Sequence, residues 1–186
     1  MHKKINFIRF HRKEITSLIY TFYNSFYNCS SLQEIILSKL TTENIKKING
    51  IFNNCLSLKE LNLSNFNTEN VKDMSNMFSG CSTLIKLNLL NFNTNKVIDM
   101  NNMFSGCSSL IKLNLSTFNT NKVINMSRMF EECSSLIALN LSNFKINIST
   151  KIYEIFDSCD ALKKIRLIKV KSNEYYIDFY GNITTL

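Results

Sequence analysis

Cysteine is the residue type in this 186-residue sequence whose spacing could support chemistry. The six cysteines lie 26 positions apart, at Cys29, Cys55, Cys81, Cys107, Cys133 and Cys159. Evenly spaced single cysteines do not form the close pairs that zinc sites use. If the copies stack, neighbouring Cα atoms lie about 4.8 Å apart, but their Cβ vectors run parallel and do not point towards each other. We expect a ladder of buried free thiols acting as small apolar side chains, and no metal site.

The other groups that could catalyse a reaction are few. Both histidines, His2 and His11, lie near the start of the chain, outside the repeated segments. Asp73 and Asp99 occupy equivalent positions, but their simplest role is to cap a turn or to face solvent. No carboxylate pair stands beside an obvious base or nucleophile. We therefore predict that the chain is not an enzyme, with no catalytic residue and no cofactor.

The elements that must hold the cysteines follow from apolar residues with the same period. Leucine stands three positions after every cysteine and again eight positions after it, and position six carries leucine or isoleucine. A fixed period of 20 to 29 residues with an L-x-x-L-x-L core indicates a leucine-rich repeat solenoid. We predict an α/β repeat fold in which each repeat is one strand and a return segment.

Two periodicities follow each other within one repeat, residues 81–106. Leu87 and Leu89 alternate with other side chains, which predicts a strand with one buried face. Farther on, a set of apolar residues is spaced like one face of a helix: Val97, Met100, Met103 and Phe104. Gly106 can close the last turn, although Glu132 and Ser158 replace glycine in later copies. We expect a parallel β-sheet on the concave face and short helical turns on the convex face.

The chain is expected to form a single domain over residues 1–186. Proline is absent and no low-complexity linker interrupts the period, so nothing marks a domain boundary. We predict an upstream cap at residues 1–28, six repeats at 29–167 and a closing cap at 168–186. Alternation around Tyr175 and Ile177 predicts one or two closing strands in the last of these.

The most regular part of the chain carries a family resemblance. The run LNLSNFNTENVKDMSNMFSGCSTL, residues 61–84, has the tail N-V-x-x-M-x-x-M-F-x-x-C-S-x-L. It closely resembles the BspA-like leucine-rich repeat surface proteins of bacteria and anaerobic protists, over roughly residues 29–167. The resemblance implies secreted or cell-surface adhesion and interaction proteins whose repeats have no enzymatic activity.

The signals for localisation disagree. Residues 1–13 hold five cations that interrupt every apolar run before it reaches signal-peptide length. No stretch approaches a transmembrane span. The lack of a signal peptide or anchor and the free cysteines favour the cytoplasm, whereas the family resemblance favours the cell surface or secretion.

The net charge of +8 is concentrated at the two ends of the chain. Residues 1–13 and 163–171 hold five cations each, which leaves 12 cations against 14 acidic residues elsewhere. Two separate basic ends do not make a continuous basic stripe, so we expect no nucleic-acid partner. Binding of an acidic partner or a membrane surface through these basic caps stays an alternative. Like charge at both ends favours a monomer over end-to-end stacking.

The outward strand positions predict a candidate partner-binding site on the concave face. They lie five and seven residues after the cysteines, and the candidates are Glu34, Glu60, Asn62, Lys86, Asn88, Lys112, Asn114, Asn140, Lys164 and Arg166. This face should be acidic at one end, amide-lined in the middle and basic at the other. Solenoids commonly bind partners on the concave face. We expect a non-catalytic protein-interaction or adhesion module; the alternative is a structural or assembly element with no dedicated ligand.

Asparagine repeats at one of these outward positions. Asn62, Asn88, Asn114 and Asn140 would stack about one strand spacing apart. Three of the four begin N-x-S sequons, but glycans on Asn114 and Asn140 would collide in adjacent repeats. The pattern favours an amide ladder, with glycosylation the weaker alternative. Such a ladder could equally satisfy itself without any ligand.

Overall fold

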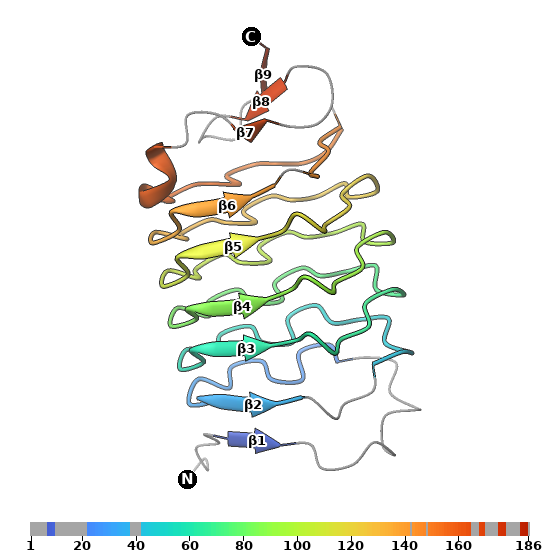
Figure 1. Cartoon of the computed structure of the whole chain (residues 1–186), viewed down its shortest axis with the longest axis vertical. Coiled ribbons are helices and arrows are strands. Elements are labelled where there is room, and N and C mark those ends of the chain that lie inside the picture. Colours follow the sequence, from blue (N-terminus) through green and yellow to red (C-terminus); the bar gives the residue numbers. More distant parts are fainter. Residues whose placement is uncertain are drawn as a thin grey trace.

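The computed structural model describes residues 7–9, 22–37, 42–141, 143–147, 149–164, 168–169, 175–177 and 183–185. The chain winds as a stack of similar coils, with one short strand of each coil on the same side (Figure 1). These strands are β1 (Phe7–Arg9), β2 (Glu34–Ile36), β3 (Glu60–Asn62), β4 (Lys86–Asn88), β5 (Lys112–Asn114) and β6 (Ala138–Asn140). The architecture is the predicted repeat solenoid.

The strands are parallel, and their register equals the repeat period. β1 pairs with β2, β3 with β4 and β5 with β6. Glu60 lies opposite Lys86 and Lys112 lies opposite Ala138, so residues 26 positions apart are neighbours across the sheet. β2 lies beside β3 and β4 beside β5, which continues the row in chain order (Figure 1). A constant period thus converts each sequence position into a column on the surface.

β1 is a strand that the repeat pattern did not predict. Phe7–Arg9 pairs in parallel with β2, and Ile8 lies opposite Ile35. The offset from Phe7 to Glu34 is 27 residues, one more than the repeat, and no cysteine precedes the strand at the usual distance. The start of the chain therefore extends the concave sheet by one strand.

The predicted strand of the sixth repeat lies mostly outside the described residues, which do not include 165–167. Residues Asp160–Lys164 form a 3-10 helix, η2, whose last residue is at the position where earlier repeats begin their strand. Asp160 stands in its first turn, where a negative charge is favourable. Leu162 N donates to Cys159 O at 3.0 Å, as the leucine of every earlier repeat does to its cysteine, and Ala161 N donates to Ser134 O of the preceding coil at 3.2 Å. Five of the six predicted strands of residues 29–167 are observed, as β2 to β6, and the sixth stays a prediction.

Three strands follow η2, where the alternation predicted one or two. β7 (Ile168–Lys169), β8 (Tyr175–Ile177) and β9 (Ile183–Thr185) form a sheet in the order β7-β8-β9. Both pairings are antiparallel, unlike those of the repeats. The direction of hydrogen bonding therefore changes after the sixth repeat, and Figure 1 shows this sheet at the end of the stack.

The convex side consists of consecutive turns where short helical turns were predicted. Two residues per coil, four positions apart, have positive φ, such as Asn102 (52°) and Gly106 (73°). Glu132 (57°) and Ser158 (56°) adopt the same conformation, which confirms that glycine is not required there. No helix in the described residues is long and apolar enough to cross a membrane.

The left-handed residues explain why no helix forms. A residue with positive φ interrupts the helical backbone conformation. Every second N–H group of this segment then points towards the next coil and not along a helix axis. Asn102 N donates to Ser127 O at 3.0 Å, and Phe104 N donates to Met129 O at 2.9 Å. These inter-coil bonds satisfy backbone groups that a helix would satisfy internally. The helical spacing thus correctly predicted which residues are buried, but the backbone there forms turns and not the predicted helical segment.

The core is a set of columns, one for each inward position. In the repeat that begins at Cys81, the inward residues predicted from the sequence are buried except Leu87, which is half-buried. One phenylalanine column runs through six coils with ring centroids 5.5 to 5.9 Å apart: Phe26, Phe52, Phe78, Phe104, Phe130 and Phe156. Each repeat thus buries its apolar surface against its neighbours.

Candidate functional site

The strands β2 to β6 present most of the predicted site residues on one exposed face. Eight of the ten candidates lie on these strands and are exposed: Glu34, Glu60, Asn62, Lys86, Asn88, Lys112, Asn114 and Asn140. The central residue of each strand points inward, so its two neighbours point outward. The sheet therefore brings together side chains that are as much as 106 positions apart in the sequence.

The basic end of the predicted gradient, Lys164 and Arg166, lies only partly within the described residues. Lys164 is the last residue of the 3-10 helix η2, and Arg166 lies outside the described residues. The outward position of the preceding repeat is the uncharged Ala138. Among the described strands, the concave face thus ends in Ala138 and Asn140 at β6, and the basic end stays a prediction.

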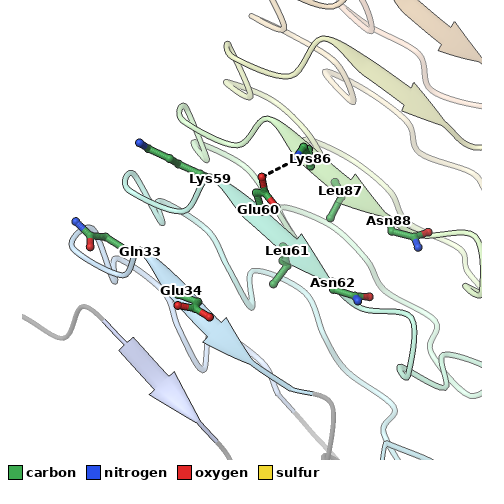
Figure 2. A pocket seen from close by; sticks show the side chains of 9 residues that line it. All are labelled: Gln33, Glu34, Lys59, Glu60, Leu61, Asn62, Lys86, Leu87 and Asn88. Atoms are coloured by element: carbon green, nitrogen blue, oxygen red, sulfur yellow. Dashed lines mark hydrogen bonds and ion pairs between the residues drawn. The ribbon is translucent and has the colours of Figure 1, made fainter.

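Glu60 and Lys86 form an ion pair across β3 and β4. Lys86 Nζ lies 2.6 Å from Glu60 Oε1, and both side chains are well exposed (Figure 2). Exposed pairs of this kind contribute about 0 to 1 kcal/mol to stability. Two charges of the predicted gradient therefore compensate each other.

Three asparagines at the same outward position of successive strands bond to their own backbone and not to one another as the predicted amide ladder would. Asn62 Oδ1 accepts a hydrogen bond from Ser64 N at 3.0 Å, and Asn114 Oδ1 accepts one from Ser116 N at 3.0 Å. Asn88 Oδ1 accepts from Leu90 N at 3.2 Å. Each side chain closes an Asx turn at the end of its own strand. Among the described residues, the Nδ2 groups of these three asparagines have no hydrogen-bond partner, so the donors face the concave surface.

Two shallow depressions hollow the concave face. The first, of about 680 Å³, lies over β2 to β4 and is lined by Gln33, Glu34, Lys59, Glu60, Leu61, Asn62, Lys86, Leu87 and Asn88 (Figure 2). The second, of about 600 Å³, lies over β5 and β6 and is lined by Leu87, Lys112, Leu113, Asn114, Ile137, Ala138, Leu139 and Asn140. Both combine an apolar floor with amide and ammonium groups.

Sequence reasoning missed the residues that stand immediately before the strands. This position is four residues after each cysteine, and it carries Gln33 and Lys59 in the early repeats and Ile85, Ile111 and Ile137 in the later ones. The isoleucines are exposed. The alternation that defined the outward positions began one residue later, so it assigned this position to neither face. Three isoleucines in one column, beside a column of buried leucines, were the available signal.

Asp73 and Asp99, for which no catalytic role was predicted, each accept a backbone hydrogen bond. Asp73 Oδ1 accepts from Ser75 N at 2.9 Å, and Asp99 Oδ1 accepts from Asn101 N at 2.8 Å. Both aspartates therefore cap turns, which is one of the two roles that the sequence predicted for them.

The buried thiols are unreactive at neutral pH. Burial raises the pKa of the Cys81 thiol to about 12, so the reactive thiolate is suppressed.

The cysteines form a hydrogen-bonded ladder in the core. From Cys55 onward, each Sγ donates to the carbonyl oxygen of the phenylalanine 29 residues earlier, as in Cys81 to Phe52 at 3.1 Å and Cys107 to Phe78 at 3.2 Å. Five of the six thiols are buried, whereas Cys29 is half-buried, so the prediction of six buried thiols is wrong at the first repeat. The ladder is part of the packing, away from the concave face.

Comparison with known proteins places this geometry in a family. A search of curated proteins finds no match. Among solved structures, the chain is similar to the leucine-rich repeat protein TpLRR of T. pallidum, with a TM-score of 0.53 and 19% identity over 87% of this chain and 80% of that one. This likeness supports the leucine-rich repeat fold. Two overlapping matches, at residues 6–109 and 82–179, show that the chain belongs to the family described as "Mycoplasma protein of unknown function, DUF285".

Proposed function

We propose that this chain is a non-catalytic protein-interaction module that binds a protein partner on its concave face. The observation that carries the proposal is the exposed strip of charged and amide side chains across β2 to β6. The backbone ladder holds this strip rigid, so little ordering entropy is lost on binding. Charges such as Glu34 and Lys112 orient the partner more than they add affinity.

The finer assignment is adhesion at a cell surface. Its support is the resemblance of residues 61–84 to BspA-like repeats, whose members are usually surface adhesion proteins. The rival function is binding of an acidic partner or membrane through the basic start of the chain. Arg9 in β1 gives this rival a specific basis, because it continues the concave sheet at its upstream end.

Charge reversal tests the proposal directly. The double variant Lys86→Glu with Lys112→Glu should weaken capture of the native partner from the cell that makes the protein. Its melting temperature should change little, because both side chains are exposed and the Glu60 pair is a surface pair.

The matched control is Lys96→Glu with Lys122→Glu. These lysines lie in the same two repeats, are also exposed, and change the net charge by the same amount. The control should retain the partner. If capture survives on the first variant and fails on neutralising Arg9, Arg12 and Lys13 to glutamine, the site is the basic cap and the concave-face proposal is wrong.

A further inference from the structure

A row of exposed isoleucines borders the downstream half of the concave face. Ile85, Ile111 and Ile137 are 44%, 43% and 55% exposed, and each stands one residue before its strand. Ile137 N donates to Ile111 O at 2.9 Å, so these two are direct neighbours. We call these three residues the isoleucine row. A continuous exposed apolar row of this kind marks an interaction surface more often than scattered apolar residues do.

The floor of the adjoining depression is also apolar. Ala138 occupies the outward position that carries Glu60, Lys86 and Lys112 in other repeats, so its short side chain leaves the surface open there. Leu139 beneath it is half-buried, in contrast to the buried Leu113. The depression of about 600 Å³ forms at this place. An aliphatic side chain can fill it against Ile137, Leu139 and Leu87.

One charge borders this depression, and it is not compensated. Lys112 lies opposite Ala138 across β5 and β6, and its side-chain ammonium makes no ion pair or hydrogen bond with the described residues. Lys86, by contrast, is bound to Glu60. No carboxylate lines the depression, whereas Asn114 contributes an amide donor. The surface thus places a cation and an amide beside an apolar hollow, which is complementary to a carboxylate beside an aliphatic side chain.

Strand spacing sets the length of a matching segment. The isoleucine row spans three coils, about 9.6 Å at roughly 4.8 Å per coil. An extended peptide rises about 3.3 Å per residue, so about three residues cross the row. Lys112 and Ile137 belong to adjacent coils, so the carboxylate and the aliphatic group must lie within about two residues of each other.

We infer that the surface formed by the isoleucine row, Lys112 and Ala138 docks an extended segment of a protein partner in which an Asp or Glu lies within two residues of a Leu, Ile or Val. This inference rests on the proposed function, because it names the partner chemistry of the same concave face. It adds the isoleucine row, which lies outside the predicted site, and it locates the contact over β4 to β6.

Selection of peptides on the full chain tests the inference. The 186-residue protein is immobilised and used to select from a display library of random 12-residue peptides, and the enriched peptides are synthesised for measurement of Kd. Enriched sequences should contain the acidic and aliphatic pair. Lys112→Gln should weaken binding about tenfold to a hundredfold, as expected for loss of a charged hydrogen bond of about 1.5–3 kcal/mol. Ala138→Arg should abolish binding by filling the depression.

Two control variants separate the site from general effects. Lys122→Gln removes the same charge from an exposed lysine of the same repeat as Lys112, and Ile124→Ser removes an isoleucine that is 58% exposed at a different position of the coil. Both should bind the peptides like the unmodified protein, whereas Ile137→Ser should bind them more weakly. Ala138 is exposed, so the melting temperature of Ala138→Arg should stay close to that of the unmodified protein.

Several outcomes would overturn the inference. One is enrichment of no peptide, or of peptides without a carboxylate. Another is binding that Ala138→Arg does not affect. Binding of the protein to a glycan array that Ala138→Arg blocks, without peptide selection, would show that the surface takes carbohydrate. If instead the native partner is lost on reversing Lys86 and Lys112 but kept in Ala138→Arg, the proposed function stands and only this inference fails.

Discussion

At the scale of single residues, buried threonine hydroxyls are satisfied by hydrogen bonds from one coil to the next. Thr94 Oγ1 donates to Asn119 O at 3.0 Å and accepts from Asn119 N at 2.7 Å. Thr68 and Thr120 make the same two bonds to their next coils. A buried hydroxyl that both donates and accepts a hydrogen bond costs little free energy of folding. These bonds also fix the register of neighbouring coils. The cysteine thiols play a similar part on another column.

The buried thiols predict a loss of stability at alkaline pH. Burial raises the pKa of Cys81 and of Cys159 to about 12, and it also raises the pKa of Cys107, with further contributions from Cys81 and Cys133. A group whose folded pKa is raised stabilises fully below its unfolded pKa, about 8.5 for cysteine, and loses that contribution as pH rises towards the folded value. The melting temperature should therefore be flat up to about pH 8 and fall above it.

The control for this prediction is Cys81→Ala, which removes one raised thiol and keeps every lysine and tyrosine. Its free energy of unfolding should fall less steeply with pH, by up to about 1.4 kcal/mol per pH unit. Urea unfolding between pH 7 and pH 10.5 measures both slopes. Equal slopes for the two proteins would contradict the assignment of the alkaline loss to the thiols.

At the scale of the element, the unit of this molecule is one 26-residue coil. Its strand pairs on the concave side, and its turn residues pair on the convex side, as Gly106 N does with Glu131 O at 2.8 Å. Steric space limits the turn column too, because a Cβ added to Gly106 would lie 3.3 Å from the Gly80 backbone. Each coil is therefore held by its neighbours on both sides.

Deleting one complete coil, Cys81–Gly106, should leave a folded protein. The deletion joins Gly80 to Cys107, which recreates the native sequence at that junction, and it moves Lys112 to the place of Lys86 opposite Glu60. Deleting only the 13 residues Cys81–Asn93 should prevent folding, because this deletion brings a turn segment into register with the strands of neighbouring coils. Thermal melts followed by circular dichroism compare the two, and similar cooperative transitions would refute the prediction.

At the scale of the whole molecule, stability is close to a sum over coils and the contacts between them. The phenylalanine column makes this visible, because Phe104 stacks on Phe78 and on Phe130 at 5.6 Å each. Phe156 stacks on Phe130 at 5.5 Å and is the last ring of the column in the described residues. A central ring therefore couples two interfaces, and a terminal ring couples one.

Truncation of these two rings should have unequal effects. Phe104→Ala should lower the free energy of unfolding by about 3–5 kcal/mol and make unfolding less cooperative, because it opens a cavity between two coils. Phe156→Ala should cost less, because only one stacking interface is lost. Urea titrations read out both quantities. The opposite order of the two losses would show that the end of the solenoid, and not its middle, limits stability.

The amino-acid sequence was sufficient for the repeat, its period and its buried positions. Leu84, Val97, Met100 and Phe104 are recognisable as core residues because burial depends on spacing along the coil, and spacing is repeated five times over. The parallel strands and the outward position of Lys86 and Lys112 follow from the same alternation. Burial and the inward or outward direction of a side chain can therefore be predicted, because each depends only on the position of the residue within the repeat.

The tertiary structure alone decided properties that depend on backbone torsions and on neighbours across coils. Turns and helices bury the same apolar residues, so only the positive φ of residues such as Asn102 distinguishes them. The ion pair of Glu60 with Lys86 and the Asx turn of Asn88 depend on which group lies nearest in space. β1 and η2 lie near the two ends of the stack, where a coil has fewer neighbours to impose its conformation.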